Sequence, residues 1–246
     1  MAKPPSTDYQ TVSRPSTSRD DARMSSERLK VEIDGQYFCF QRPADLETLW
    51  EAMDDNQHDA DDRIPYWVEI WPSSILLAEW IRQNAFRLRG RRCLDLGCGL
   101  GLCASVAAGQ AHVLGVDYQW SALAYARQSA VDNGVPEISW LQMDWRHPGI
   151  KPHSLSFIWG AEIVYERRFF QPLLELFEHS LAPNGCIWLA SPERAVSRPF
   201  WERLAERRWR AERLRKKRID YRDYSMEVAL WEVRRADGPR PLLNRP

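Results

Sequence analysis

The chain has 246 residues, with 34 basic and 34 acidic side chains and no formal net charge. This balance lacks the basic character typical of nucleic-acid-binding proteins, so no nucleic-acid partner is expected. No apolar stretch approaches the ~20 residues of a membrane helix, so no membrane partner is expected. Five cysteines, an odd number found mostly in apolar runs, indicate reduced thiols in a cytoplasmic protein. They lack a C-x-x-C or histidine pattern, and no metal site is expected.

The first part of the chain divides into a tail and an extension. Residues 1–27 are rich in Ser, Thr, Pro and charge, which is typical of a disordered tail. Apolar residues alternate over 29–40 around an Asp-Gly turn, which predicts a β-hairpin. A short helix is expected over 46–53. Residues 51–62 carry six acidic side chains and are interpreted as a solvated loop, with a docking edge for a basic partner as the alternative.

An aromatic run precedes a helical pattern within residues 64–81. Pro72 followed by serine is typical of a helix start, and apolar residues at helical spacing come after it. The segment before Pro72 holds more aromatic side chains than an ordinary loop. Packing of the helix on a sheet accounts for Trp67 and Trp80.

The stretch 91–101, Arg-Arg-Cys-Leu-Asp-Leu-Gly-Cys-Gly-Leu-Gly, is the centre of the chain's organisation. Its apolar run 93–96 predicts a buried strand, and an apolar segment from Leu102 predicts a helix. Between them lies a turn with three glycines: Gly97, Gly99 and Gly101. Strand, glycine turn and helix begin a nucleotide-binding βα unit. Glycines suit this turn because they let a ligand approach the backbone and permit positive φ.

The spacing of these glycines differs from the G-x-G-x-x-G/A pattern of dinucleotide enzymes, because Leu102 occupies a position where that pattern needs Gly or Ala. Asp95 stands two residues before the first glycine. A carboxylate there suits a ligand with a cationic amino group and no phosphate to repel it. S-adenosylmethionine is such a ligand, and a nicotinamide enzyme is the alternative.

Further elements follow in a regular order. Strands are expected at 112–116, 138–143, 155–160, 186–190, 211–218 and 225–234. Helices are expected at 121–130, 169–181 and 200–210. The sixth strand carries five basic residues, interpreted as its exposed face, with a contact to an acidic partner as the alternative.

Acidic residues follow the predicted strands. Asp117 ends the second strand, 22 residues after Asp95. A carboxylate at this position can accept hydrogen bonds from both ribose hydroxyls of a nucleoside, and a cap for the next helix is the alternative. Tyr118 is a candidate contact to adenine. Asp144 and Glu162 follow the third and fourth strands. Because the carboxyl ends of parallel strands meet at one edge of a sheet, these acids are expected in one cleft.

The segment from Asp95 to Gly101 resembles motif I of the class I, seven-strand S-adenosylmethionine-dependent methyltransferases. Trp71-Pro72 and Glu162-x-x-Tyr165 resemble motifs of the family 16 group, many of which modify lysine in proteins. The resemblance covers about 64–235. It implies a Rossmann-like α/β fold, with a seven-stranded, mostly parallel sheet, helices on both faces and an N-terminal β-hairpin extension. The expected division is a tail (1–27), an extension (28–63), a methyltransferase domain (64–235) and a tail (236–246).

The resemblance also implies site residues. Glu162 and Tyr165 are implied as catalytic residues. In the family, an acid at the position of Asp144 accepts from the adenine amino group, and Trp145 either donates through its ring nitrogen or packs on the base. The implied cofactor-binding residues are Trp71, Asp95, Gly97, Gly99, Gly101, Asp117, Tyr118, Asp144, Trp145 and Ala161.

The sequence therefore predicts an S-adenosylmethionine-dependent methyltransferase that acts on a protein side chain, with lysine favoured. Its cofactor is S-adenosyl-L-methionine and its partner a protein substrate. The alternatives are a small-molecule methyltransferase and a non-catalytic module that binds the cofactor and works by protein contact. An Asn-Pro-Pro-Tyr motif, typical of adenine or glutamine-amide methylation, is absent, which argues against those substrates.

Overall fold

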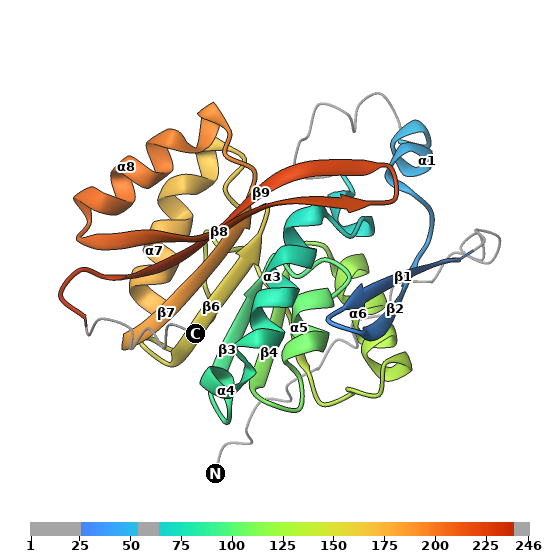
Figure 1. Cartoon of the computed structure of the whole chain (residues 1–246), viewed down its shortest axis with the longest axis horizontal. Helices are drawn as coiled ribbons and strands as arrows, with labels where there is room; N and C mark the ends of the chain where they lie inside the picture. The colour runs from blue at the N-terminus through green and yellow to red at the C-terminus, as the bar shows by residue number, and fades with distance from the viewer. Residues whose placement is uncertain (1–25, 54–63, 239–246) are drawn as a thin grey trace, which may run out of the picture.

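The structure, a computed structural model, describes residues 26–53 and 64–238 (Figure 1). The predicted disordered tail lies outside this range, except for its last two residues. Most of the predicted acidic loop and the last eight residues of the chain also lie outside the described residues.

A seven-stranded sheet forms the centre of the described residues, in the order β5-β4-β3-β6-β7-β9-β8. Its strands are β3 (Arg92–Leu96), β4 (His112–Asp117), β5 (Ser139–Gln142), β6 (Leu155–Ala161), β7 (Leu181–Ser191), β8 (Trp209–Tyr221) and β9 (Tyr224–Arg235). Strands β3 to β7 pair in parallel, whereas β9 runs antiparallel to both β7 and β8. The predicted Rossmann-like α/β fold is confirmed.

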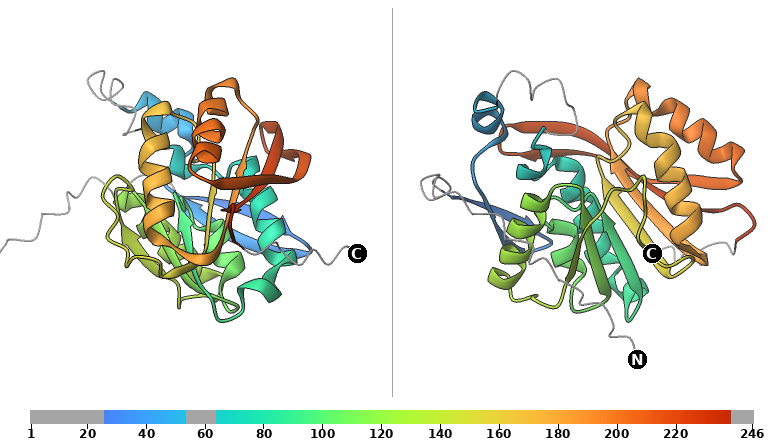
Figure 2. Two further views of the ribbon diagram at one scale, coloured as in Figure 1. Left: turned by 90° about the vertical axis from the view of Figure 1, so that its left-hand side faces the viewer. Right: turned by 180° about the vertical axis from the view of Figure 1, so that it is seen from behind.

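Helices cover both faces of this sheet. They are α3 (Pro72–Gln83), α4 (Ala85–Leu88), α5 (Leu102–Ala107), α6 (Trp120–Asp132), α7 (Phe170–Ser180) and α8 (Arg198–Glu206). Neighbouring residues of a strand point to opposite faces. Cys93 therefore packs in the core beneath α3 and α5, and Leu94 in the core beneath α7 and α8. Figure 1 shows α3 and α5 in front of β3 and β4, and Figure 2, from behind, shows α7 and α8.

The N-terminal hairpin is confirmed and shares a core with the sheet domain. Strands β1 (Glu27–Ile33) and β2 (Gln36–Arg42) meet at an Asp-Gly turn with positive φ, and the short helix α1 (Leu46–Glu51) follows. Leu29 and Ile33 are buried in the same core as Leu77 of α3. The Asn133 side chain after α6 accepts from Cys39 N at 2.9 Å. The extension is thus packed against α3 and α6 (Figure 1).

The two largest differences from the predicted boundaries are at the end of α8 and at the start of β7. The helix predicted over 200–210 ends at Glu206, because Arg208 adopts φ 60° and the next residue begins β8. Strand β7 begins at Leu181, before the predicted 186–190. Leu155 pairs with Leu181 and Phe157 with Cys186, so the residues between form an irregularity inside the strand.

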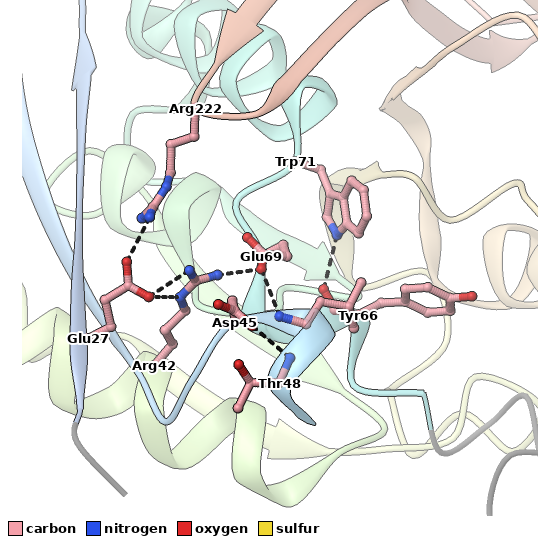
Figure 3. Close-up of polar contacts among 9 residues, drawn as sticks. Glu27, Arg42, Asp45, Thr48, Tyr66, Glu69, Trp71 and Arg222 are labelled. Carbon is pink, nitrogen blue, oxygen red and sulfur yellow. Dashed lines mark hydrogen bonds and ion pairs between the residues drawn. The ribbon is translucent and has the colours of Figure 1, made fainter. Parts of the chain in front are cut away.

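Strands β8 and β9 are longer than predicted and form a hairpin that extends past the sheet. Ala229–Val233 of β9 pair with β7, whereas β9 pairs with β8 from its first residue. The projecting end reaches the first residue of β1, because Arg222 and Glu27 form an ion pair of 2.8 Å (Figure 3). The basic run lies on the exposed part of β8, where Lys217 pairs with Glu79 of α3 at 2.9 Å.

Candidate active site

A cavity lies at the carboxyl ends of β3, β4 and β6. It brings together eleven of the twelve predicted site residues: Trp71, Asp95, Gly97, Gly99, Asp117, Tyr118, Asp144, Trp145, Ala161, Glu162 and Tyr165. Gly101 is not among the lining residues. It precedes α5, and a Cβ atom there would come within 2.8 Å of the Trp140 ring. The structure therefore gives Gly101 a packing reason for having no side chain.

Asp95 lies in β3, beneath the glycine turn, with 3% of its surface exposed. Among the described residues, no hydrogen-bond donor reaches its Oδ2 atom. Burial raises the pKa of Asp95 to about 7. A buried, unpartnered carboxylate oxygen at a cavity wall is costly for the protein unless a ligand supplies a donor or a positive charge.

The first glycine of the turn leaves space that a side chain would fill. Gly97 has φ 67°, a conformation that favours glycine, and a Cβ atom there would lie 3.1 Å from the Ile163 side chain and 3.8 Å from the Trp145 ring. Ile163 and Trp145 both line the cavity. The absence of a side chain at Gly97 therefore keeps this part of the cavity open.

Asp117 joins the turn after β3 to the start of α6. Its Oδ2 accepts from Gly99 N at 2.9 Å, and its Oδ1 accepts from Gln119 N at 3.0 Å. Gln119 itself occupies the position that caps α6. Burial raises the pKa of Asp117, against these backbone hydrogen bonds. Each carboxylate oxygen can accept a further hydrogen bond, so Asp117 can hold the turn and a ligand hydroxyl together.

Asp144 and Trp145 line another part of the cavity. Asp144 accepts from Arg146 Nε at 2.8 Å and from Arg146 N at 2.9 Å. Burial alone would raise the pKa of Asp144, but the bonds from Arg146 outweigh burial and lower it. The Trp145 ring packs edge-on against Phe169, with ring centroids 5.0 Å apart.

Glu162 directly follows β6 and has an unusual backbone. Its φ is 56°, the left-handed region that residues other than glycine rarely adopt, and its N–H donates to Ala190 O of β7 at 2.9 Å. Its Oε1 accepts from Ser73 Oγ at 2.7 Å, and its Oε2 lies 3.2 Å from Arg194 Nη1. Burial raises the pKa of Glu162, opposed by Ser73 and Arg194. Backbone strain of this kind is often found at functional sites.

Aromatic side chains lie beside Glu162 in the same cavity. Trp71 precedes α3, and its Nε1 donates to Tyr66 O at 3.0 Å (Figure 3). The Tyr66 ring lies 6.3 Å from the Trp71 ring and 6.2 Å from the Tyr165 ring, measured between centroids. Sequence reasoning selected Trp71 and Tyr165 but missed Tyr66, although its position in the aromatic run was a usable signal.

A partly buried ion network lies beside the aromatic side chains Tyr66 and Trp71 (Figure 3). Arg42 of β2 pairs with Glu69, which lines the cavity, and with Glu27 of β1 at 2.7 Å. Glu69 also accepts from Leu46 N at 3.0 Å, and Arg222 reaches Glu27 from the β8–β9 turn. The N-terminal hairpin, the segment before α3 and the β8–β9 hairpin are therefore linked by charge. No sequence pattern indicated this network, because its members are far apart in the chain.

Comparison with known proteins finds similarity to methyltransferases. A family model described as a methyltransferase domain matches residues 93–185. Mouse EEF1A lysine methyltransferase 3 is 27% identical over 174 residues, which cover 67% of this chain and 71% of that protein. Mouse protein N-lysine methyltransferase METTL21A is 26% identical over 127 residues, 49% of this chain and 58% of that protein.

Two further proteins extend the comparison. The ubiquinone biosynthesis O-methyltransferase of Aromatoleum aromaticum is 45% identical over 113 residues, 46% of this chain and 42% of that enzyme. The structure of the YcgJ protein from Bacillus subtilis superimposes with a TM-score of 0.57 at 14% identity, covering 66% of this chain and 99% of that one. At this identity the structural likeness shows the fold alone.

Proposed function

Because the chain carries a methyltransferase domain of the class I fold and uses S-adenosylmethionine as its cofactor, we propose that it methylates a lysine side chain of a protein. The observation that carries this proposal is the position of Glu162 at the end of β6, in the cavity that Trp71 and Tyr165 also line. Two relatives with lysine methyltransferase in their names support the choice of acceptor.

The residues around the glycine turn fit this cofactor. The unpartnered Oδ2 of Asp95 offers a negative charge to the cationic amino group of its methionine part. Gly97 leaves room for the ligand at the end of β3. Asp117 would accept from the ribose hydroxyls, Asp144 from the adenine amino group, and Tyr118 and Trp145 would flank the base. When bound, the cofactor would supply an electrophilic methyl carbon on its sulfonium. The acceptor amine would attack that carbon in line, and the thioether would be the leaving group.

The protein's own part in this reaction is positioning and exclusion of water. Ser73, which is fully buried, fixes one oxygen of Glu162. Glu162 then orients the acceptor amine through its carboxylate rather than serving as a general base. The ring faces of Trp71 and Tyr165 favour a cationic amine or its methylated product, each by about 1 kcal/mol or more when water is excluded.

A small-molecule methyltransferase is the second candidate. The O-methyltransferase relative supports it, because its identity over the aligned residues is higher than that of the lysine methyltransferases. A non-catalytic binding module is the third. Within the described residues no helix is long and apolar enough to cross a membrane. A cytoplasmic location and the lack of a nucleic-acid partner stay predictions.

Transfer of a labelled methyl group separates these candidates. The purified protein is incubated with methyl-labelled cofactor and a cell lysate, and the label is followed in proteins and in the small-molecule fraction. We expect a labelled protein band, with the label mapped by mass spectrometry to lysine and lost with Glu162→Gln. Label confined to small molecules would overturn the proposal in favour of the second candidate, and no label at all would favour the third.

A further inference from the structure

Glu162 forms an ion pair with Arg194, a residue that follows a neighbouring strand. Strands β6 and β7 are neighbours in the sheet and run parallel, so the segments that follow them lie side by side. Glu162 follows β6, and Arg194 follows β7. The Arg194 guanidinium lies 3.2 Å from Glu162 Oε2, while Ser73 holds Oε1. Each oxygen of the Glu162 carboxylate therefore has its own partner.

The backbone of Arg194 is held in place. Its carbonyl oxygen accepts from Ser197 Oγ at 2.8 Å and from Ser197 N at 3.1 Å. The adjacent acid, Glu193, pairs with Arg213 and Lys216 of β8 at 2.9 and 3.0 Å. Arg213 and Lys216 therefore pair with Glu193, whereas Arg194 pairs with Glu162.

We infer that Arg194 is a positioning residue that neutralises Glu162, so that an acceptor amine at this end of the cleft faces a carboxylate–guanidinium pair instead of a bare carboxylate. The inference rests on the proposed function, because it concerns the site where the acceptor would bind. The side chain of Arg194 is 43% exposed and that of Glu162 is 14% exposed, so the cation is the more solvent-accessible member of the pair.

The physical reason lies in the proton on the acceptor. A lysine amine must lose its proton before it can attack the methyl carbon and displace the thioether, because the ammonium form has no free electron pair. A bare carboxylate a few ångströms away favours the ammonium form and would raise the pKa of the amine. A neutral ion pair removes most of that effect. It still leaves carboxylate oxygens that can accept a hydrogen bond from the neutral amine.

The inference can be tested without an acceptor substrate. Sinefungin is a cofactor analogue that carries an amine on the carbon replacing the sulfonium, whereas S-adenosylhomocysteine has no charge there. The ratio of their dissociation constants, measured by calorimetry, reports how well the site accepts a cation. For Arg194→Gln we expect the preference for sinefungin over S-adenosylhomocysteine to rise about tenfold, which corresponds to one pKa unit of charge interaction.

Three further variants make the test specific. Arg194→Lys should return the ratio to the wild-type value, because it restores the positive charge. Glu162→Gln combined with Arg194→Gln should abolish the rise, because Glu162 is its source. Arg213→Gln, which removes the neighbouring ion pair with Glu193, should leave the ratio unchanged. Melting temperatures check that each variant is folded.

An unchanged ratio for Arg194→Gln, or an equal rise for Arg213→Gln, would overturn the inference. A rise that persists without Glu162 would do the same. These outcomes are distinct from failure of the proposed function. The latter is decided by where the label goes in the transfer experiment, and the binding ratio does not depend on the identity of the acceptor.

Discussion

Gly99 and Asp117 are joined by a hydrogen bond of 2.9 Å, in which the backbone N–H of Gly99 donates to Oδ2 of Asp117. Gly99 belongs to the turn after β3, and Asp117 is the last residue of β4. The glycine turn and the acid that follows the next strand are therefore one unit. A change at Asp117 acts on the shape of the turn as well as on any ligand that the carboxylate holds.

Asp117→Ala should accordingly impair both binding and folding. We expect the dissociation constant for S-adenosylhomocysteine to rise at least about tenfold, and the free energy of unfolding to fall by about 1–3 kcal/mol, since two backbone N–H groups lose their acceptor. Calorimetry and urea denaturation measure the two effects. Asp220→Ala, at an exposed acid of β8, is the control and should change neither. Wild-type affinity in Asp117→Ala would refute a role in binding.

The buried carboxyl of Asp95 makes stability depend on pH. Its pKa is about 7 in the folded protein against 3.8 for the free side chain, so between these values the folded state keeps a proton that the unfolded state has lost. Its contribution to stability is fully present below 3.8 and is lost as the pH rises through about 7. Relative to Asp95→Asn, the wild type should lose about 2–3 kcal/mol of unfolding free energy between pH 5 and 8. Urea denaturation at both pH values checks this, and parallel curves for the two proteins would contradict it.

The same carboxyl should make ligand binding depend on pH in the opposite direction. Binding of the cationic amino group of S-adenosylhomocysteine needs the charged form of Asp95, which predominates above pH 7 in the free protein. We expect the affinity to rise from pH 5.5 to about 7 and then to level off, with a slope approaching tenfold per pH unit at the acid end. Asp95→Asn should bind more weakly and lose this pH dependence. A variant with the wild-type profile would show that another group governs binding.

Removal of Arg42 from its buried ion pair should destabilise the protein more than removal of an arginine from an exposed ion pair. Its side chain is 3% exposed and that of Glu69 is 6% exposed, so removal of the guanidinium leaves a buried carboxylate without its partner. Arg42→Met is expected to lower the unfolding free energy by about 3–5 kcal/mol, measured by urea denaturation. Arg28→Met, which removes an exposed ion pair with Asp132, should cost less than about 1 kcal/mol. Combining Arg42→Met with Glu69→Met should recover part of the loss, and simple addition of the two single effects would argue against coupling.

Gly101 and Gly134 form a matched pair for separating backbone strain from packing. Both have positive φ, 82° and 74°, but a Cβ atom at Gly101 would come within 2.8 Å of Trp140, whereas one at Gly134 meets nothing within 4 Å. Gly134→Ala should cost about 1 kcal/mol from strain alone. Gly101→Ala should cost about 1–3 kcal/mol more because the Trp140 ring must move. Equal losses in thermal or urea unfolding would mean that the clash is relieved without cost.

Local sequence pattern was sufficient to predict the order of strands and helices and the positions of the acids at the strand ends. These features depend on apolar runs, glycine turns and a carboxylate after a strand. In parallel strands the carboxyl ends meet at one edge, so the amino-acid order alone could place Asp95, Asp117 and Glu162 in one cleft. The lengths of β8 and β9 could not be predicted, because their turn at Arg222 lacks the Gly or Pro that marks most turns.

Which charges meet was determined by the packing of remote segments. Arg42 and Glu69 are 27 residues apart, and Arg194 reaches Glu162 because β6 and β7 lie side by side. Gly97 and Gly101 belong to the same glycine pattern in the sequence. In the structure Gly97 lines the cavity, whereas Gly101 packs against the Trp140 ring. Ion pairs and close packing depend on distances between segments that are remote in the chain. Local patterns carry no information on those distances, and the fold has to form before they exist.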